Sequence, residues 1–446
     1  MTQLAAPLPA PLVPPRLSPG AVADRLVSLD VFRGVVILAM LLVNNLGDYR
    51  AVSFFWKHAD WKPENLLADF RAYFAGLPQT GPAGGEMAGV FPLFWHCTLA
   101  DFVMPWFMLI IGVAVPFSVA AALGRGDTGV GHWVRVVRRG AMLYALGWAL
   151  GLSLQFLAYR FSANAEARLG FTLGMDVLQL LGVSYVLCRL GYCLPRYPRL
   201  VLAGALFLAH WSLLRYLPQG EVPAGTFTGK NNAVSYAYAH WPIFQAITLI
   251  PSDPTPFLRF SIAGMLSAVP ATATMLIGTY LGDTLRAASL SPTRRAVYLL
   301  VTGLLLIGVG VLWAFDLPMN KVRWSPCYLV YCSGVGSVLL AGLYYVIDVR
   351  LAGSTLVRRS VWPIVALGVN AIGIYFISIF LKIWLLNMVK VVGDNGQPVM
   401  LTTKIVATLQ SHFGAVGGSW VFTVVFVGVV WSAAMFAWRR RLVWKV

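Results

Sequence analysis

Charged residues are scarce in this chain of 446 residues. Asp, Glu, Lys and Arg make up 11% of it, against about 25% in a typical soluble domain. This scarcity excludes an ordinary soluble enzyme, and a hydrophobic share of 58% excludes a disordered or fibrous chain. The class that remains is an all-α, polytopic transmembrane helix bundle.

Acidic residues are scarcer still. Asp and Glu number 17 against 34 Lys and Arg, so the formal charge at pH 7 is +17. In a soluble protein such an excess would indicate nucleic acid as the partner. Here the basic residues lie in short segments between apolar stretches, as they do in the cytoplasmic loops of membrane proteins. We therefore expect membrane lipid, and no nucleic acid, beside this chain.

Cysteines are few, and their spacing is not that of a metal site. The five lie in or beside apolar stretches, and neither Cys188 and Cys193 nor Cys327 and Cys332 has the two-residue gap of a zinc knuckle. We expect them to be packing residues, and we expect no metal site.

A cleavable signal sequence is also lacking. The first twenty residues, MTQLAAPLPAPLVPPRLSPG, hold six prolines and show no basic segment followed by an apolar one. We expect residues 1–24 to form a disordered, proline-rich cytoplasmic lead. Residues 25–446 then form a single transmembrane domain.

Long apolar runs, by contrast, are abundant. A spanning helix needs about 20 mostly apolar residues. Ten stretches meet this requirement, namely 28–46, 98–122, 137–158, 173–192, 198–216, 260–283, 295–315, 327–348, 361–386 and 416–437. Ten spans place both termini on one side of the membrane. The loops on that side are short and basic, which predicts that both termini are cytoplasmic.

The long connections are expected on the outer side, at 47–97, 217–258 and 387–415. They are rich in Trp, Tyr, Gly and Pro, so space for a polar substrate is expected there. We see no internal repeat of the kind that indicates an inverted-repeat transporter.

Ionisable groups at membrane depth cost on the order of 3 kcal/mol each on insertion scales, and are therefore candidates for function. Asp30 and Arg33 lie three residues apart in the first apolar stretch, so they share a helix face and can pair. The pair is either an interfacial salt bridge or an anion entrance on the inner side. Asn44 and Asn45 lie at the outer end of the same helix, where capping accounts for one of them and leaves the other amide to donate.

A carboxylate and two histidines are expected near the outer boundary. Asp101 lies about one turn inside the second apolar stretch, where it either caps its own helix or orients a histidine, as in acyl transfer. His58 lies in FFWKHADW, and His96 lies at the end of a long segment, in FPLFWHC. Imidazole serves as a base or a nucleophile near neutral pH, so either ring is a candidate for catalysis.

Asn45 and four further polar residues are candidates for substrate contact. Gln179 lies within an apolar stretch, where helix–helix hydrogen bonding explains it as well as substrate contact does. The segment FDLPMNKVRWSPCY places Asn320, Lys321 and Trp324 at an outer mouth.

Several segments together resemble the heparan-α-glucosaminide N-acetyltransferase family of transmembrane acetyltransferases and its bacterial relatives. RLVSLDVFRGVVILAMLLVNN resembles the family's first core helix, FFWKHADW its outer-loop histidine motif, and TLADFVMPWFMLIIGVAVPFS the helix that follows. VLQLLGVSY, LPMNKVRWSPCYLVY with YYVIDV, GVNAIGIY and the terminal LVWKV fit as well. The likeness runs in order from about residue 25 to the C-terminus.

The resemblance implies a definite activity. The family moves an acetyl group from cytosolic acetyl-CoA, across the membrane, to the amino group of a terminal glucosamine on the far side. By motif position, the family's active-site histidine falls on His58, its helix-end asparagine on Asn44 and its helix-start aspartate on Asp101. Asp101 would hold the imidazole tautomer, and the Asn44 amide would donate to the thioester oxygen as negative charge develops.

The same activity implies a binding site for acetyl-CoA as co-substrate on the inner side. The nucleotide and phosphates of CoA are anionic, so Arg33, with Asp30 beside it, and the inner arginines Arg138 and Arg139 are expected to line the entrance. A bacterial-type chain of this kind is expected in the inner membrane, with an envelope glycan or a lipid-linked sugar as the acceptor.

The sequence departs from the family pattern in two places. A long insert, at about 62–95, separates the histidine motif from Thr98, whereas in the family the motif runs almost directly into the helix. Many relatives carry Trp-His just before that threonine, which Trp95-His96 resembles, so His58 and His96 both remain candidates. The relatives' Gln-Arg pair is Gln-Leu here, beginning at Gln179, which puts a charged contact from that position in doubt.

A transporter or flippase for a polar or lipid-linked solute is the alternative, because it would use the same intramembrane polar groups. The acceptor, the choice between N- and O-acetylation, and the choice between an acetyl-enzyme and direct transfer stay open. The expected partners are membrane lipid and the amino-sugar or glycan acceptor, with a homodimer left open as well.

Overall fold

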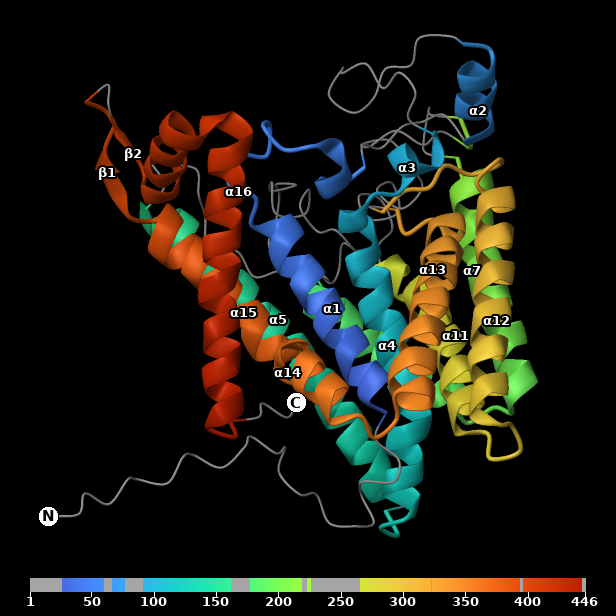
Figure 1. Ribbon diagram of the computed structural model, residues 1–446. Coiled ribbons are helices and arrows are strands. Elements are labelled where there is room, and N and C mark those ends of the chain that lie inside the picture. Colours follow the sequence, from blue (N-terminus) through green and yellow to red (C-terminus); the bar gives the residue numbers. More distant parts are fainter. Residues whose placement is uncertain are drawn as a thin grey trace, which may run out of the picture.

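The structure of the protein is a computed structural model, which describes residues 26–59, 66–76, 91–127, 129–161, 177–218, 223–225, 265–321, 323–393 and 396–442. The predicted lead at 1–24 lies outside the described residues, as does the middle of the predicted insert. Figure 1 shows that the described chain folds mainly into long helices that run between the two ends of one bundle.

The long helices follow one another along the chain. In the first half they are α1 (Val27–Asn44), α4 (Leu99–Leu123), α5 (Gly129–Phe161), α6 (Val177–Gly191) and α7 (Arg196–Tyr216). In the second half they are α11 (Ala268–Arg286), α12 (Pro292–Trp313), α13 (Pro326–Leu343) with the π-helical segment η4 (Tyr344–Arg350), α14 (Thr355–Val369), α15 (Ala371–Ile379) with the π-helical segment η5 (Phe380–Asn387), and α16 (Leu401–Arg439). Each of the ten predicted apolar stretches overlaps one of these helices or helix pairs.

Shorter elements connect them. The helical ones are η1 (Phe54–Trp56), α2 (Leu66–Phe74), α3 (Leu93–His96) and η3 (Met265–Ser267). The strands β1 (Lys390–Val392) and β2 (Pro398–Met400) form an antiparallel hairpin in which Val391 lies opposite Val399.

Several of the described helices are fit to cross a membrane. Six are long and apolar enough, namely α1, α4, α7, α12, α13 with η4, and α16. A seventh crossing results if Arg359–Val369 and Ala371–Trp384, which meet at an angle of 69°, count as one broken span. The chain is therefore a helical bundle that contains candidate membrane spans, as its composition predicts.

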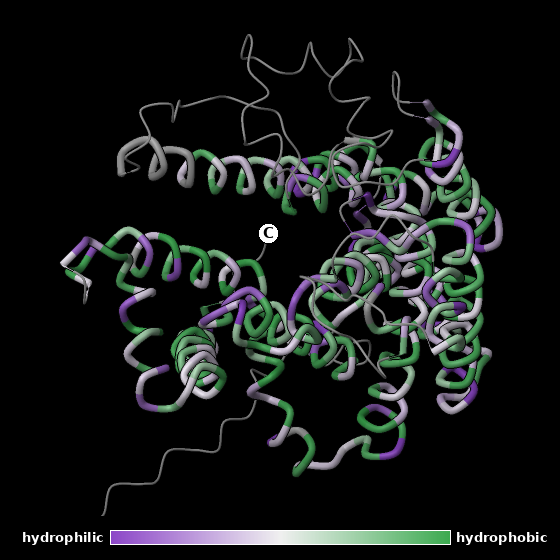
Figure 2. Tube along the Cα trace, turned by 90° about the horizontal axis from the view of Figure 1, so that it is seen from above, coloured by the Kyte–Doolittle hydropathy of each residue, from purple (hydrophilic) through white to green (hydrophobic). Residues whose placement is uncertain are grey.

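The bundle has two distinct ends. The helix α1 begins, and α16 finishes, at the same end of the bundle (Figure 1), which we call the inner end, and the opposite end is the outer end. Seen from above, green predominates along the helices in Figure 2, which marks hydrophobic residues. Apolar surface along the helices, rather than only at their contacts, is what a lipid environment requires.

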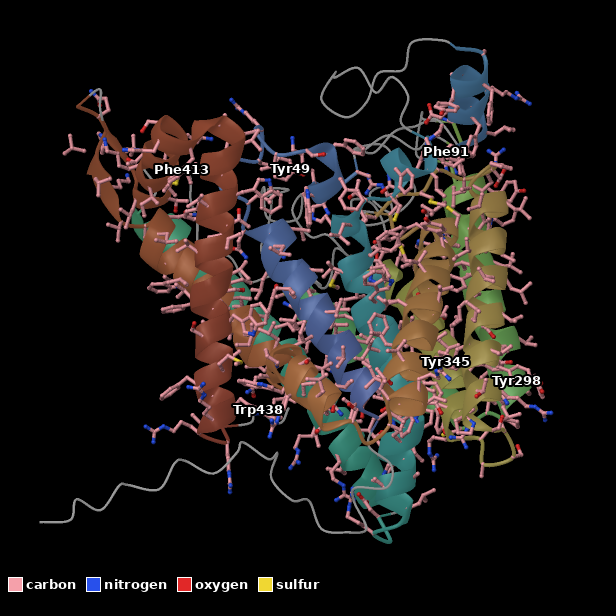
Figure 3. All side chains as sticks on the ribbon, viewed as in Figure 1. Tyr49, Phe91, Tyr298, Tyr345, Phe413 and Trp438 are labelled. Carbon is pink, nitrogen blue, oxygen red and sulfur yellow. The ribbon has the colours of Figure 1, made fainter. Side chains whose placement is uncertain are left out.

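Exposed aromatic side chains gather near both ends. Figure 3 labels Tyr49, Phe91 and Phe413 toward the outer end, and Tyr298 and Tyr345 toward the inner end. All five are exposed on the structure. Aromatic rings of this kind are enriched at the two membrane interfaces, so their placement supports a bundle that crosses the bilayer along its helix axes.

The core lies where α1, α4, α11 and α13 pack together. Phe32, Leu109, Leu276 and Tyr328, one from each helix, are all buried there. Because lipid is as apolar as a leucine side chain, close approach of helix backbones contributes more to such packing than burial from water does.

The closest approach between α1 and α14 is made by two glycines. A Cβ atom at Gly34 would overlap the backbone carbonyl of Ile364, and one at Gly368 would lie 2.7 Å from the backbone nitrogen of Gly34. Small residues allow exactly this kind of backbone contact in membrane bundles. The contact fixes the position of α14, which forms one wall of the cavity described below.

We expect Gly34→Ala to destabilise the protein by on the order of 3 kcal/mol, since the clash is with backbone rather than with a flexible side chain. The measurement is the thermal unfolding midpoint of detergent-solubilised protein. Gly342→Ala is the matched control, because a Cβ there meets no atom within 4 Å. Equal midpoints for the two variants would contradict the proposed packing role of Gly34.

Two of the predicted outer connections contain regular structure. The stretch at 387–415 holds the β1–β2 hairpin and the first part of α16, which is interrupted at Gly414 with φ 74°. Within 47–97, α2 is anchored because the backbone N–H of Leu66 donates to the carbonyl of Ala314 at 3.1 Å. The sequence pattern predicted neither α2, which is short, nor the first part of α16, which continues into an apolar span.

Candidate functional site

The start of α4 holds the predicted outer carboxylate. Asp101 lies in the first turn of the helix, and its Oδ2 accepts from the backbone N–H of Thr98 at 3.1 Å. The Thr98 hydroxyl lies 3.1 Å from the same oxygen and also contacts the carbonyl of Lys57. A carboxylate at this position satisfies an otherwise unpaired N–H of the helix start. The prediction that Asp101 caps its own helix therefore agrees with the geometry.

The same carboxylate also holds the His58 loop. The backbone N–H of Ala59 donates to Asp101 Oδ2 at 3.0 Å, and His58 Nδ1 lies 3.0 Å from Asp101 Oδ1. The backbone N–H of His58 donates to the hydroxyl of Tyr49 at 3.1 Å. The two functions considered for Asp101, helix capping and histidine orientation, are thus performed by its two oxygens together.

This contact determines which ring nitrogen of His58 is free. Asp101 accepts hydrogen bonds from two backbone N–H groups and acts as a carboxylate, so the matching tautomer of His58 carries its proton on Nδ1 and donates it in a hydrogen bond to Oδ1. The lone pair then lies on Nε2. The His58 side chain is 41% exposed, whereas that of Asp101 is 2% exposed. A buried carboxylate therefore presents an accessible imidazole with Nε2 available for chemistry.

Lys321 is the third ionisable side chain at this centre. Its Nζ lies 3.0 Å from Nδ1 and 3.4 Å from Nε2 of His58, and 4.0 Å from Asp101 Oδ1. It also donates to the carbonyl of Ala100 at 3.3 Å. Burial lowers the pKa of Lys321 from its ordinary value, and the nearby Asp101 carboxylate partly offsets that effect.

A tight loop holds Lys321 in place. The Asn320 Oδ1 accepts from the backbone N–H of Arg323 at 3.0 Å, and the Asn320 backbone N–H donates to the Ser325 hydroxyl at 2.8 Å. Trp324 is fully buried, with φ at 54°, a left-handed conformation that costs about 1–2 kcal/mol for a residue other than glycine. Asn320 and Trp324 were predicted to contact substrate, but both are buried in this loop and do not line the cavity.

A cavity of about 650 Å³ opens at the His58 ring and runs along α4. On α4 its lining extends from Ala100 to Ser118, which is about 27 Å of helix at 1.5 Å per residue. The hydrocarbon core of a bilayer is about 30 Å thick. The cavity therefore extends over most of the length of the bundle.

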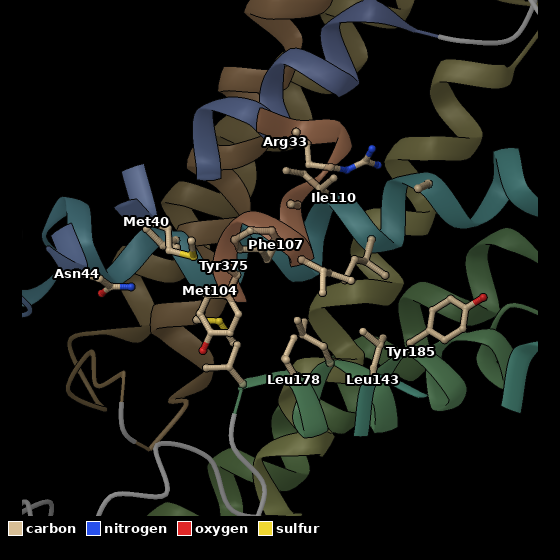
Figure 4. A pocket seen from close by; sticks show the side chains of 18 of the residues that line it. Arg33, Met40, Asn44, Met104, Phe107, Ile110, Leu143, Leu178, Tyr185 and Tyr375 are labelled. Atoms are coloured by element: carbon tan, nitrogen blue, oxygen red, sulfur yellow. The ribbon is translucent and has the colours of Figure 1, made fainter. Parts of the chain in front are cut away.

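The chemistry of the lining changes along the cavity. In Figure 4, Asn44 lies at one side of the view and Tyr185 at the other, with the apolar side chains of Met40, Met104 and Phe107 nearer to Asn44. The polar ends and apolar middle suit a ligand with a charged part, a neutral arm and a reactive end. Sequence reasoning missed these three apolar residues because nothing in an apolar stretch distinguishes a cavity wall from a packed core.

The inner part of the cavity is basic. Arg33 lines it, and its Nη1 lies 3.4 Å from Asp30 Oδ1, as their three-residue spacing predicts. Arg139 lines it from α5, with its guanidinium 5.1 Å from the centre of the Tyr185 ring. Arg138 was predicted to share this role, but it is not among the lining residues. Helix rotation places consecutive residues on different faces, so only one of the two arginines faces the cavity.

His96 belongs to a different contact. Its Nε2 lies 2.7 Å from Asp69 Oδ2, which joins the end of α3, where His96 lies, to α2, which holds Asp69. The His96 side chain is 3% exposed, and it does not line the cavity. Of the two histidines that the sequence left open, His58 is the one within hydrogen-bond distance of Asp101.

The adjacent residues Asn44 and Asn45 have different surroundings. Asn44 lines the cavity, and its backbone carbonyl accepts from Lys382 Nζ at 2.5 Å. Asn45 is buried, and its Nδ2 donates to the carbonyl of Leu41 at 2.8 Å, so it is the residue that caps α1. Gln179, another predicted substrate contact, is buried against Gly147 of α5 and is not part of the lining. Of the five substrate candidates, only Lys321 faces the cavity.

The arrangement can support base or nucleophilic catalysis at its outer end and bind an anion at its inner end. Within the described residues, no three His, Cys, Asp or Glu side chains are grouped so as to hold a metal ion. No family model matches the chain, and no curated protein is significantly similar to it.

Proposed function

We propose that the protein is a transmembrane acetyltransferase. It transfers an acetyl group from cytosolic acetyl-CoA to an amino sugar or glycan acceptor on the outer face of the membrane. The observation that supports this proposal best is the cavity that connects Arg33 and Arg139 with the exposed ring of His58. The resemblance of the ordered motifs to the heparan-α-glucosaminide N-acetyltransferase family supports the same activity.

The proposal includes a topology. The ten helical stretches cross the membrane, with both termini and the basic inner end in the cytoplasm, in a bacterial inner membrane. Arg33 and Arg139 then meet the anionic nucleotide and phosphates of the donor, since guanidinium groups bind phosphate well. The apolar middle of the cavity holds the neutral arm, and the thioester reaches His58.

The residues at the outer end perform the transfer. Nε2 of His58 either attacks the thioester carbon or removes the proton of the acceptor amine, and both routes need its lone pair. Asp101 keeps the proton on Nδ1 and stabilises the ring when Nε2 becomes protonated. The amide of Asn44, which also lines the cavity, donates to the oxygen on which negative charge develops.

The direct test uses purified protein in lipid nanodiscs with acetyl-labelled acetyl-CoA and glucosamine-ended acceptors. We expect label in the acceptor and release of free CoA. A transporter or flippase would instead move solute across proteoliposomes without consuming acetyl-CoA, and CoA would not stabilise it against heat. Solute flux without acetyl transfer would overturn the proposal.

The two adjacent arginines on α5 provide a test of the donor site. We expect Arg139→Gln to weaken CoA binding about tenfold, because it removes a charged hydrogen-bond donor from the cavity. Arg138→Gln removes the same charge from an exposed position outside the lining and should leave the affinity unchanged. The CoA-dependent shift in unfolding temperature measures both. Equal weakening by the two variants would indicate general electrostatic attraction instead of a site.

A further inference from the structure

The ammonium group of Lys321 is held against the His58 ring by contacts that use only part of its hydrogen-bonding capacity. An ammonium has three N–H donors and no acceptor. One donor is directed to the carbonyl of Ala100 at 3.3 Å, and Asp101 Oδ1, at 4.0 Å, is a charge neighbour rather than a hydrogen-bond partner. The remaining donors of Lys321 therefore point toward His58 and the cavity that both residues line.

Neither ring nitrogen of His58 can accept a hydrogen bond from Lys321 and also perform its other function. In this tautomer Nδ1 keeps its proton and donates it in a hydrogen bond to Asp101, so it has no lone pair for Lys321, although the two nitrogen atoms are 3.0 Å apart. Nε2, at 3.4 Å, has a lone pair, but that lone pair is what catalysis consumes. A cation that is this close to the reacting nitrogen, and is not required to orient the ring, needs another function.

A position beside Nε2 is where negative charge develops during acyl transfer. When a nucleophile adds to the thioester carbon, the carbonyl oxygen becomes an oxyanion, and in the adduct on Nε2 it is only two bonds from that atom. We propose that Lys321 is a catalytic residue that donates a hydrogen bond from Nζ to this oxyanion, opposite the amide of Asn44. This inference rests on the proposed acetyltransferase function.

The step balances without another reactant. The attacking lone pair forms the new bond to carbon, and the carbonyl π pair moves to oxygen, where the Lys321 ammonium stabilises it without losing its proton. The electron pair on oxygen then re-forms the C=O bond, the C–S bond breaks and the CoA thiolate leaves. In direct transfer, the proton lost by the acceptor amine passes to Nε2 of His58 and from there to the thiolate. In transfer through an Nε2 adduct, the amine then displaces Nε2 from the acetyl carbon, and the amine proton passes to the freed Nε2 and from there to the thiolate.

Lys321→Met tests the inference, because it keeps the length of the side chain and removes the charge. We expect turnover to fall about 10²- to 10³-fold with the KM for acetyl-CoA unchanged, as for loss of an oxyanion donor. Lys321→Arg retains a positive donor and should recover part of the rate. Lys57→Met is the matched control, since its ammonium contacts the Arg50 carbonyl and the Tyr49 ring rather than His58.

The pH profile provides a second readout that a structural role would not change. Burial lowers the pKa of Lys321, so the wild-type rate should fall on the alkaline side as the ammonium loses its proton, and Lys321→Met should lack that limb. The groups that face Lys321 are His58, the Asp101 carboxylate and the thiols of Cys97 and Cys332.

The outcomes separate the two proposals. Wild-type activity together with full activity of Lys321→Met would overturn the function of Lys321 and leave the acetyltransferase standing. A stable acetyl group on Nζ, found by mass spectrometry after single turnover, would also overturn it, because Lys321 would then be an acyl acceptor. Absence of any acetyl transfer by the wild type would overturn both.

Discussion

Acetyl transfer by His58→Gln is expected to be at least about 10³-fold slower than by the wild type. Glutamine has nearly the size of histidine but offers neither a base nor a nucleophile, and a positioned base typically contributes 10²- to 10⁴-fold. The Asp101 carboxylate would retain its hydrogen bonds from Thr98 and Ala59, so the start of α4 should stay folded. The rate of label transfer from acetyl-CoA to a glucosamine-ended acceptor measures the effect.

His96→Gln is the control for this experiment. His96 is buried against Asp69 and lies outside the cavity lining, so its loss should lower thermal stability and leave the transfer rate within a small factor of wild type. CoA should still stabilise His58→Gln, because Arg33 and Arg139 lie at the other end of the cavity. If His96→Gln were inactive while His58→Gln turned over normally, the assignment of the active-site histidine would be reversed.

Asp101→Asn should reduce transfer about 10³- to 10⁴-fold with little change in CoA binding. An amide that donates toward Nδ1 would favour the tautomer with the proton on Nε2, which removes the lone pair from the cavity. The substitution is nearly isosteric, so Oδ2 can be replaced by the amide oxygen and still accept from the backbone N–H groups of Thr98 and Ala59. Turnover and CoA affinity are measured in parallel on the same preparation.

The double variant shows whether the two residues act as a unit. If Asp101 acts only through the imidazole, His58→Gln with Asp101→Asn should be no slower than His58→Gln alone. Multiplicative losses would mean that Asp101 has a separate function, such as holding the start of α4, and would contradict a purely orienting role.

The helices and the local contacts of the site could be predicted from sequence. Each apolar stretch that was long enough overlaps a helix or, at 361–386, a broken helix pair, because apolar length is a property of the local sequence. The Asp30–Arg33 pair and the contact between Thr98 and Asp101 each span three residues, so helical periodicity suffices to predict them.

Contacts between distant segments could not be predicted in the same way. His58 and Asp101 are 43 residues apart, and Lys321 is 263 residues from His58, so their meeting depends on how the helices pack. The sequence placed Lys321 at an outer mouth but gave no reason to set it beside an imidazole. The sequence offered Arg138 and Arg139 together for the donor entrance and could not separate them, since the rotation of α5 about its axis is decided by its neighbours.

The apolar part of the cavity lining, which includes Met40, Met104 and Phe107, has a consequence for the proposed function. A hydrated ion that entered from either side would have to give up its water among thioether and aromatic groups, which is prohibitively costly. A neutral arm carrying an acetyl group meets no such barrier. Under the proposed function, acetyl groups would therefore cross the membrane without opening a path for ions.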